Sequence, residues 1–302
     1  MKTFQGKTAV ITGAASGFGL ETSRLAARAG MNVVMADVQA EPLAQAVAEI
    51  ETLGAKVLPF KLDVAKAEQV EAMGRATQER FGAPHLVFNN AGVGAGGLIW
   101  EHSLKDWEWV VGVNLMGVAH GVRVFTPMML DAAKKDPAYE GHIVNTASMA
   151  GMVNMPNMGV YNVTKNAVVA LSETLYQDLS LVTDQVHCSV LCPFFVPTGI
   201  IHSERARPSE MNEERPLTRS QLVAKALSEK AVTSGKLTAA DIARKVMDAV
   251  AGNTFYIFSH PHALGVVQTR LEDVMLGRNP SDPFKDRPQI GQQLREALRS
   301  AG

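Results

Sequence analysis

The feature that most constrains the fold is a regular alternation of short Val- and Ile-rich segments with longer amphipathic segments over the first 260 residues. Short apolar runs predict buried strands, and apolar residues repeating every three to four positions predict helices. The predicted strands span 7–12, 32–37, 56–62, 85–89, 141–147, 186–192 and 254–258. The predicted helices span 17–30, 41–53, 66–81, 104–132, 159–182 and 238–251. Because parallel strands need crossover helices, this order predicts an α/β fold with a doubly wound parallel sheet of about seven strands.

Two segments depart from this alternation. Residues 198–236 are rich in charge, include HSERARPSEMNEERP and show only a late helical pattern. Loops after the carboxyl ends of parallel strands surround the ligand crevice, so we interpret this segment as a lid, with a plain surface insertion as the alternative. Residues 261–302 show helical spacing, a Pro-rich stretch and a last helix near 290–300. We therefore expect one domain over 1–260, which includes the lid, and a helical extension over 261–302 that packs on the body or on a partner subunit.

Composition excludes several classes of function. A formal net charge of −1 supplies no overall field that would attract nucleic acid or a membrane surface, and the chain has no apolar run of the roughly 20 residues that a spanning helix requires. The eight histidines lack carboxylates or cysteines at ligand spacing, so no metal site is predicted. Cys188 and Cys192 fall on one predicted strand, where a disulfide has poor geometry. Reduced thiols and the absence of a signal-like start predict a cytoplasmic protein.

The first predicted strand ends in TGAASGFG, residues 12–19, which contains Gly13, Gly17 and Gly19. Small residues allow a sharp turn and a close approach to a pyrophosphate, whose charge is favoured by the amides at the start of the next helix. Asp37 ends the second strand 18 residues later. A carboxylate there accepts hydrogen bonds from the adenosine ribose and repels a 2′-phosphate, and Ser16 and Val38 add no cation, so NAD is favoured over NADP. The alternative is that Asp37 only caps the next helix.

Six motifs in order give the chain a strong resemblance to the short-chain dehydrogenase/reductase family, over nearly all of residues 6–260. They are TGAASGFG, LDV at 62–64, NNAG at 89–92, VNLMG at 113–117, IVNTASMAG at 143–151 and YNVTK at 161–165. The resemblance implies a three-layer Rossmann-like fold and a catalytic tetrad of Asn114, Ser148, Tyr161 and Lys165. It also implies a homodimer or homotetramer, formed by pairing of the helices at 104–132 and 159–182.

The cofactor-binding residues that we expect come from the glycine-rich turn, the strand ends and the segment after the sixth strand. They are Gly13, Ser16, Gly17, Phe18, Gly19, Asp37, Asp63, Val64, Asn90, Ala91, Gly92, Tyr161, Lys165, Pro193, Val196 and Thr198. In the family, residues at the positions of Asp63 and Val64 flank the adenine, and Thr198 stands where the nicotinamide amide is usually contacted.

The reaction chemistry can be argued from the residues themselves. Oxidation of an alcohol needs a base for the hydroxyl proton, and tyrosine, with an ordinary pKa of about 10, is a poor base at neutral pH. An ammonium about 4 Å away favours the phenolate by on the order of three pKa units, before desolvation opposes it. Tyr161 and Lys165 are four residues apart and share a helix face. Ser148 would stabilise charge on the substrate oxygen, and Asn114, which is costly inside a helix, is expected to bind a water that relays the proton from Lys165.

The expected substrate pocket includes Met149, Met155, Phe194 and Phe195. Phe194 replaces a glycine that the family usually has after this strand, and it either narrows the site or is a tolerated loop variation. Met and Phe offer adaptable apolar contacts, which favours a bulky apolar or aromatic substrate. The long tail and the strand reading FYIFSHP also resemble bacterial dehydrogenases of bulky aromatic alcohols, including the Cα-dehydrogenases of lignin-derived compounds.

The sequence therefore predicts an NAD-dependent oxidoreductase that interconverts a small-molecule secondary alcohol and a ketone. Two alternatives remain open at this point. One is an NADP-dependent carbonyl or 3-oxoacyl reductase, and the other is a non-catalytic NAD-binding protein that uses the scaffold for interaction with a partner.

Overall fold

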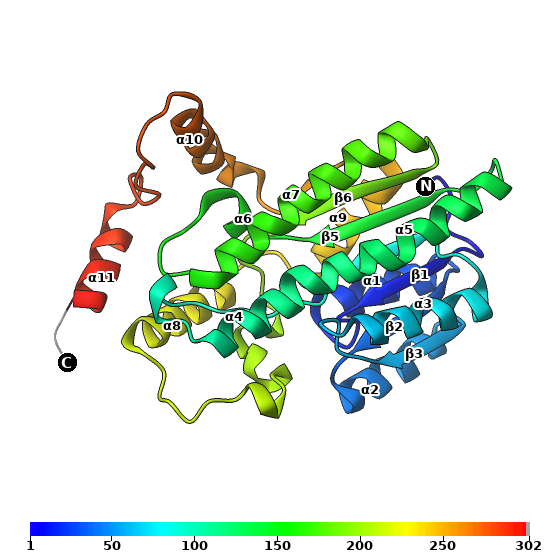
Figure 1. Ribbon diagram of the computed structural model, residues 1–302, viewed down its shortest axis with the longest axis horizontal. Coiled ribbons are helices and arrows are strands. Elements are labelled where there is room, and N and C mark those ends of the chain that lie inside the picture. The colour runs from blue at the N-terminus through cyan, green and yellow to red at the C-terminus, as the bar shows by residue number, and fades with distance from the viewer. Residues whose placement is uncertain (300–302) are drawn as a thin grey trace.

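The computed structural model describes residues 1–299 and contains one seven-stranded sheet flanked by helices (Figure 1). The strands are β1 (Thr8–Thr12), β2 (Asn32–Asp37), β3 (Val57–Lys61), β4 (Leu86–Asn89), β5 (Gly141–Thr146), β6 (Val186–Cys192) and β7 (Tyr256–Phe258). The helices of the body are α1 (Gly17–Arg28), α2 (Ala40–Thr52), α3 (Ala67–Phe81), α4 (Leu104–Val111), α5 (Gly117–Lys135), α6 (Ala150–Val153), α7 (Gly159–Val182) and α9 (Ala239–Gly252). All seven predicted strands and all the predicted body helices are present, which confirms the predicted fold class.

The strand order is β3-β2-β1-β4-β5-β6-β7, and every neighbouring pair is parallel. The chain moves outward from β1 to β3 and then returns to the centre to place β4 on the other side of β1. Loops after β1 and β4 therefore leave the sheet in opposite directions, and a crevice opens at their carboxyl ends. This position in the sheet predicts where a ligand binds before any side chain is considered.

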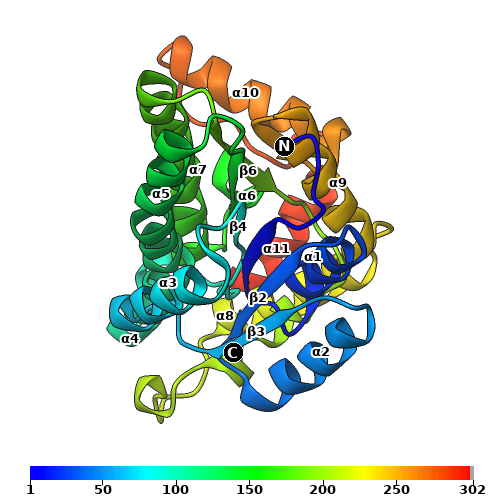
Figure 2. The same cartoon turned by 90° about the vertical axis from the view of Figure 1, so that its right-hand side faces the viewer.

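Each face of the sheet has its own apolar core. Helices α1, α2 and α9 cover one face with Ile11, Val33 and Phe88 beneath them, while α3, α5 and α7 cover the other with Val10 and Ile143 beneath them (Figure 2). Successive strand residues point to opposite faces, and both faces are buried. The strands therefore read as continuous Val- and Ile-rich runs in the sequence.

The predicted helix at 104–132 differs in the structure. Helix α4 is followed by a π-helical turn, Gly112–Met116, before α5 continues the same rod to Lys135. A π turn inserts one extra residue between hydrogen-bonded positions and is found mostly at functional sites. Asn114 lies in the middle of this turn and is fully buried.

The lid contains two short 3₁₀ helices, Gly199–Ala206 and Ser209–Met211, and the helix α8 (Arg219–Thr233), which accounts for the late helical pattern in the sequence. The C-terminal extension forms α10 (Leu264–Met275) and α11 (Pro288–Arg299), which project from the body on the side of the lid (Figure 1). Helix α10 contacts α6, and α11 contacts α8, so the extension packs on its own chain. The predicted end of the last helix at Ser300 lies outside the described residues.

Within residues 1–299, every helix is too short or too polar to cross a membrane.

Candidate active site

A crevice runs along the carboxyl ends of the central strands, where the strand order reverses. Most of the residues expected to bind a cofactor line it. They are Gly13, Ser16, Gly17, Phe18, Asp37, Asp63, Val64, Asn90, Ala91, Gly92, Tyr161, Lys165, Pro193 and Thr198. Residues from five strand ends and from helix α7, separated by up to 185 positions in the chain, therefore meet in one hollow.

The glycine-rich turn is packed too tightly to accept side chains. Gly13 has a φ of 65°, and a Cβ on Gly19 would lie 2.1 Å from the carbonyl oxygen of Gly13. The absence of both Cβ atoms brings the turn and the first turn of α1 together, so that backbone amides at the start of the helix face the crevice. This arrangement suits a pyrophosphate, whose negative charge is favoured at a helix N-terminus. Gly19 therefore shapes the turn from behind, outside the crevice lining.

Asp37 is held in place by two backbone amides. The amide of Ala15 donates to Oδ2 at 3.1 Å, and the amide of Gln39 donates to Oδ1 at 3.0 Å. Both oxygens keep acceptor capacity for the crevice, because each carboxylate oxygen accepts about two hydrogen bonds. The carboxylate and the glycine-rich turn together fit the ribose and pyrophosphate of a dinucleotide.

The ends of β1 and β4 are tied together by side chains. The hydroxyl of Thr12 accepts from the amides of Asn90 at 2.9 Å and Ala91 at 3.1 Å, and Asn90 Nδ2 donates to the Thr12 carbonyl at 2.9 Å. These bonds replace ladder hydrogen bonds at the point where the two strands diverge. They hold the floor of the crevice in a fixed shape.

Tyr161, Lys165 and Ser148 meet at one end of this crevice. Tyr161 and Lys165 lie on the first two turns of α7, one helical turn apart, and are 8% and 2% exposed. Nζ of Lys165 lies 5.7 Å from the centre of the Tyr161 ring and donates to the carbonyl of Thr146 at 2.8 Å. Ser148, after β5, lies close enough to the Tyr161 side chain to influence its pKa. Its Oγ accepts from the amide of Ala150 at 3.1 Å and donates to the carbonyl of Pro193 at 3.4 Å. The structure thus brings the expected base, cation and hydroxyl together.

Burial sets the pKa values of this group. Desolvation raises the pKa of Tyr161, with the hydrogen bond from Ser148 acting in the opposite direction. Desolvation also lowers the pKa of Lys165 to about 8. The sequence argument gave the effect of the ammonium before desolvation was counted. In the folded protein without cofactor, desolvation is the larger influence on Tyr161, because burial penalises the charged phenolate.

Asn114 is placed by the π turn beside this group, but its side chain is committed to the protein. Its Oδ1 accepts from the amide of Val93 at 2.8 Å, and its Nδ2 donates to the carbonyl of Val93 at 3.0 Å. Nδ2 also lies 3.3 Å from the hydroxyl of Thr164. These bonds fix the backbone of the loop that follows β4, next to Gly92 and Lys165. Oδ1 keeps a second lone pair, so the relay water expected at this side chain stays a prediction.

The residues expected in the substrate pocket are more scattered. Met149 is 1% exposed and packs in a core cluster with Val153 and Val267 of the C-terminal extension, so it supports the loop before Tyr161. Met155 lines a second hollow outside the cofactor crevice. Phe194 is 37% exposed and packs against Phe195.

The rings of Phe194 and Phe195, which were expected to contact the substrate, lie outside the lining of both hollows. Val196, which was expected to bind cofactor, is a buried core residue.

Sequence reasoning missed the part of the crevice wall that the lid and helix α4 supply. These residues are Trp109, Gly199, Ile200, Ser203, Arg205, Ala206 and Pro208. Ser203 holds the lid down, since its Oγ accepts from the amide of Gly94 at 2.8 Å. The signal that could have identified Trp109 is its position one helical turn before Val113, another crevice residue.

Comparison with known proteins identifies the class of protein to which this site belongs. The family model described as short chain dehydrogenase matches residues 7–209, which include the glycine-rich turn, Ser148, Tyr161 and Lys165. The chain therefore belongs to the short-chain dehydrogenase family and is an oxidoreductase of that family.

Individual relatives are similar over the whole chain. A dehydrogenase/reductase of CLA biosynthesis from Lactiplantibacillus plantarum is 32% identical over 95% of this chain and 99% of its own length. A C alpha-dehydrogenase from a Sphingobium species is 30% identical over 100% of this chain and 95% of its own. Among solved structures, a short-chain dehydrogenase/reductase from Burkholderia phymatum in complex with NAD is 52% identical, with a TM-score of 0.90 over 94% of this chain and 99% of its own.

Proposed function

We propose that this protein is an NAD-dependent dehydrogenase that interconverts a bulky apolar or aromatic secondary alcohol and the corresponding ketone. The observation that carries the proposal is the buried group of Tyr161, Lys165 and Ser148 at the end of a crevice whose other end holds Asp37. The first group supplies proton transfer, and the second supplies recognition of a dinucleotide. One continuous hollow joins the two.

A nicotinamide cofactor held by the crevice residues would supply the acceptor for the hydride of the alcohol carbon. The chain's own residues handle the proton and the oxygen. Tyr161 removes the hydroxyl proton, and Ser148 donates a hydrogen bond to the oxygen as charge develops on it. Lys165 is held by the carbonyl of Thr146 and favours the ionised tyrosine when it carries its own proton. In the reverse direction, Tyr161 returns the proton to the ketone oxygen.

Preference for NAD rests on the surroundings of Asp37. The neighbouring residues in the crevice wall, Val38 and Gln39, carry no positive charge, so a 2′-phosphate would meet only the carboxylate. The relative from Burkholderia phymatum was crystallised with NAD, which supports the same preference. An NADP-dependent carbonyl reductase remains the alternative within this family.

A bulky apolar substrate is supported by the second hollow, in which Met155 keeps the role that the sequence predicted for it. It is lined by Leu98, Ile99, Trp100, Met155 and Pro156, together with Gly159 and several asparagines. Gly159 is two residues before Tyr161, so this apolar hollow begins next to the catalytic end of the crevice. The Sphingobium relative, whose name describes a C alpha-dehydrogenase, supports the same substrate class.

The test is the substitution Tyr161→Phe, assayed by NADH formation from a panel of aryl secondary alcohols. We expect kcat/KM to fall by at least about 10³-fold, because the base is lost while the ring and its packing remain. NADH binding, followed by fluorescence, should change by less than about threefold. Tyr176→Phe, on the exposed side of the same helix, is the matched control and should keep full activity.

Retained turnover in Tyr161→Phe would show that the base lies elsewhere. A wild-type protein that binds NADH but oxidises no alcohol in the panel would favour the non-catalytic alternative. We also propose that the enzyme is a homodimer or homotetramer formed through α5 and α7, and a monomer by light scattering would contradict that.

A further inference from the structure

Asp106, in the first turn of α4, is a buried carboxylate that the proposed reaction does not use. It is 7% exposed and forms a capping box with Ser103, in which each side chain accepts from the backbone amide of the other residue. Such a box needs one oxygen of the carboxylate and is satisfied by an uncharged residue. The cap therefore does not explain why a full negative charge is buried here.

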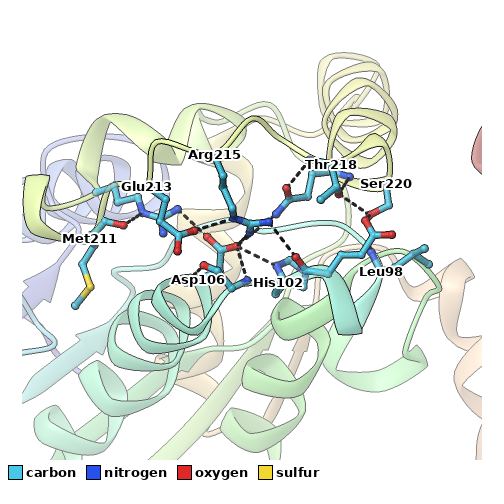
Figure 3. A network of polar contacts seen from close by, with 12 residues as sticks. Leu98, His102, Asp106, Met211, Glu213, Arg215, Thr218 and Ser220 are labelled. Atoms are coloured by element: carbon cyan, nitrogen blue, oxygen red, sulfur yellow. Dashed lines mark hydrogen bonds and ion pairs between the residues drawn. The ribbon is translucent and has the colours of Figure 1, made fainter. Parts of the chain in front are cut away.

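Two arginines of the lid converge on this carboxylate (Figure 3). Nη1 of Arg207 lies 2.9 Å from Oδ1, and Nη2 of Arg215 lies 2.8 Å from Oδ2. The Arg207 side chain is 9% exposed, so this pair is shielded from water and salt. Gln221, at the start of α8, also reaches Oδ2 at 3.4 Å. One carboxylate thus holds three points of the lid, spread over 15 residues of chain.

Each other contact in the same area involves at most one positive charge. Arg215 also pairs with Glu213 of the lid at 2.9 Å, and Arg207 lies 3.8 Å from Glu204. Nζ of Lys105 donates to the carbonyls of Glu210 and Asn212 at 2.8 Å and 2.9 Å, at the exposed surface. The hydroxyl of Ser220 donates to Glu101 at 2.7 Å (Figure 3). These bonds place the same part of the lid over the start of α4, but only Asp106 opposes two buried or half-buried positive charges at once.

A short path leads from Asp106 to the cofactor crevice. The guanidinium of Arg207 lies over the ring of Trp109, 4.9 Å from its centre, and Trp109 lines the crevice. The neighbours of Arg207 in the chain, Ala206 and Pro208, line the crevice as well. Fixing Arg207 therefore fixes both a lid segment and an aromatic wall of the cofactor site.

We propose that Asp106 is a positioning residue that holds the lid closed over the cofactor crevice through Arg207 and Arg215. The inference rests on the proposed function, since it assigns the crevice to a dinucleotide. Without the carboxylate, Arg215 keeps Glu213, but the buried Arg207 keeps only the more distant Glu204. The repulsion between the two guanidinium groups and the cost of burying a poorly paired charge then drive the lid outward. The cofactor then has to order the lid at the expense of its own binding free energy.

The test is Asp106→Asn, which keeps an oxygen for the capping box and removes the charge. We expect the Kd for NADH, measured by fluorescence, to rise about tenfold or more, while kcat at saturating NAD stays within about threefold. Hydrogen exchange of the amides in 199–217 should become faster in the protein without ligand and slow again when NADH is added. This combination distinguishes a lid that must be reordered from a general loss of stability.

Asp241→Asn is the matched control. Asp241 occupies the same capping-box position at the start of α9, with Thr238, and pairs with Arg244 on its own helix instead of with the lid. It should leave the Kd for NADH and the exchange of 199–217 unchanged. If Asp106→Asn behaves like this control in both measurements, the proposal is wrong.

A second variant guards against a folding defect at α4. Replacing Arg207 and Arg215 together by Met leaves Asp106 and its cap in place and should reproduce the weaker NADH binding and faster lid exchange. An unchanged Kd in this double variant would also overturn the proposal. NADH binding needs no alcohol, so the lid inference can hold even if no substrate is oxidised, and catalysis can be confirmed even if Asp106 proves irrelevant to the lid.

Discussion

The substitution Lys165→Met should make the protein more stable while it removes activity. Lys165 is 2% exposed, and desolvation lowers its pKa from the ordinary value of 10.5 to about 8. A difference of this size means that the folded state disfavours the charged side chain by on the order of 3 kcal/mol at neutral pH. Methionine has a similar length and helix propensity and needs no proton. Its loss of the hydrogen bond to Thr146 costs about 1 kcal/mol, so a net gain of about 2 kcal/mol is expected.

The pH dependence gives the sharper form of this prediction. Because the folded pKa of Lys165 lies below the unfolded one, the unfolded chain binds more protons between pH 8 and 10.5, and wild-type stability rises with pH in that window. Below pH 8 the full free-energy cost of burying the charged Lys165 side chain applies. At pH 9.5 about 2 kcal/mol of it should be recovered. The advantage of the Met variant should therefore shrink by that amount between pH 7 and pH 9.5.

The assay is urea denaturation of the protein without cofactor at pH 7, 8.5 and 9.5, with the free energy of unfolding taken for each variant. Lys225→Met, at an exposed position of α8, is the control and should show no pH-dependent difference from wild type. The reasoning is refuted if Lys165→Met is less stable than wild type at pH 7 or if its difference from wild type stays constant up to pH 9.5.

Three further predictions test other parts of the structure. Asp37→Ser should weaken NAD binding about tenfold and bring NADP binding closer to it, as measured by the two dissociation constants. Gly151→Ala should lower both Tm and kcat, since the new Cβ would lie 2.4 Å from the carbonyl oxygen of Lys165, whereas Gly265→Ala, with no neighbouring atom, should be tolerated. Burial lowers the pKa of His142 to about 3, so below pH 6.5 the unfolded chain binds a proton that the folded protein does not, and the free energy of unfolding falls with pH. His142→Asn should make this fall less steep by about 1.4 kcal/mol per pH unit, as measured by urea titrations.

The expected tetrad shows how much of the site can be predicted from residue spacing alone. Tyr161 and Lys165 are four residues apart on a helix and Ser148 follows the end of strand β5 by two residues, so their meeting follows from local periodicity and the edge of a parallel sheet. The conformation at Asn114 was not predictable in the same way. A π turn differs from an α-helix by one residue, and what stabilises it here is a pair of hydrogen bonds to Val93, 21 residues away.

The methionines show a different limit of prediction from sequence, which concerns the direction in which a loop side chain points. Met149 and Met155 were expected to face the substrate because they lie between Ser148 and Tyr161. The structure buries Met149 in a core cluster that includes Val267 of the C-terminal extension, whereas Met155 lines the second hollow, which we propose as the site of the apolar part of the substrate. Which side of a loop faces a ligand depends on what packs on its other side, and here that is a segment more than 100 residues further along the chain.

By itself, the sequence of this protein determined the alternation of strands and helices, the order of the polar motifs at the strand ends and hence the family. It also predicted the dinucleotide crevice and the reacting residues. These follow from short-range periodicity and from the geometry of parallel sheets. Only the tertiary structure determined which charged side chains of the site are desolvated and which are paired. The depression of the pKa of Lys165 arises from desolvation by several elements at once, and the contact between Asp106 and Arg207 joins residues 101 positions apart. Neither the desolvation of a single polar side chain nor a contact at that separation produces a periodic pattern in the sequence.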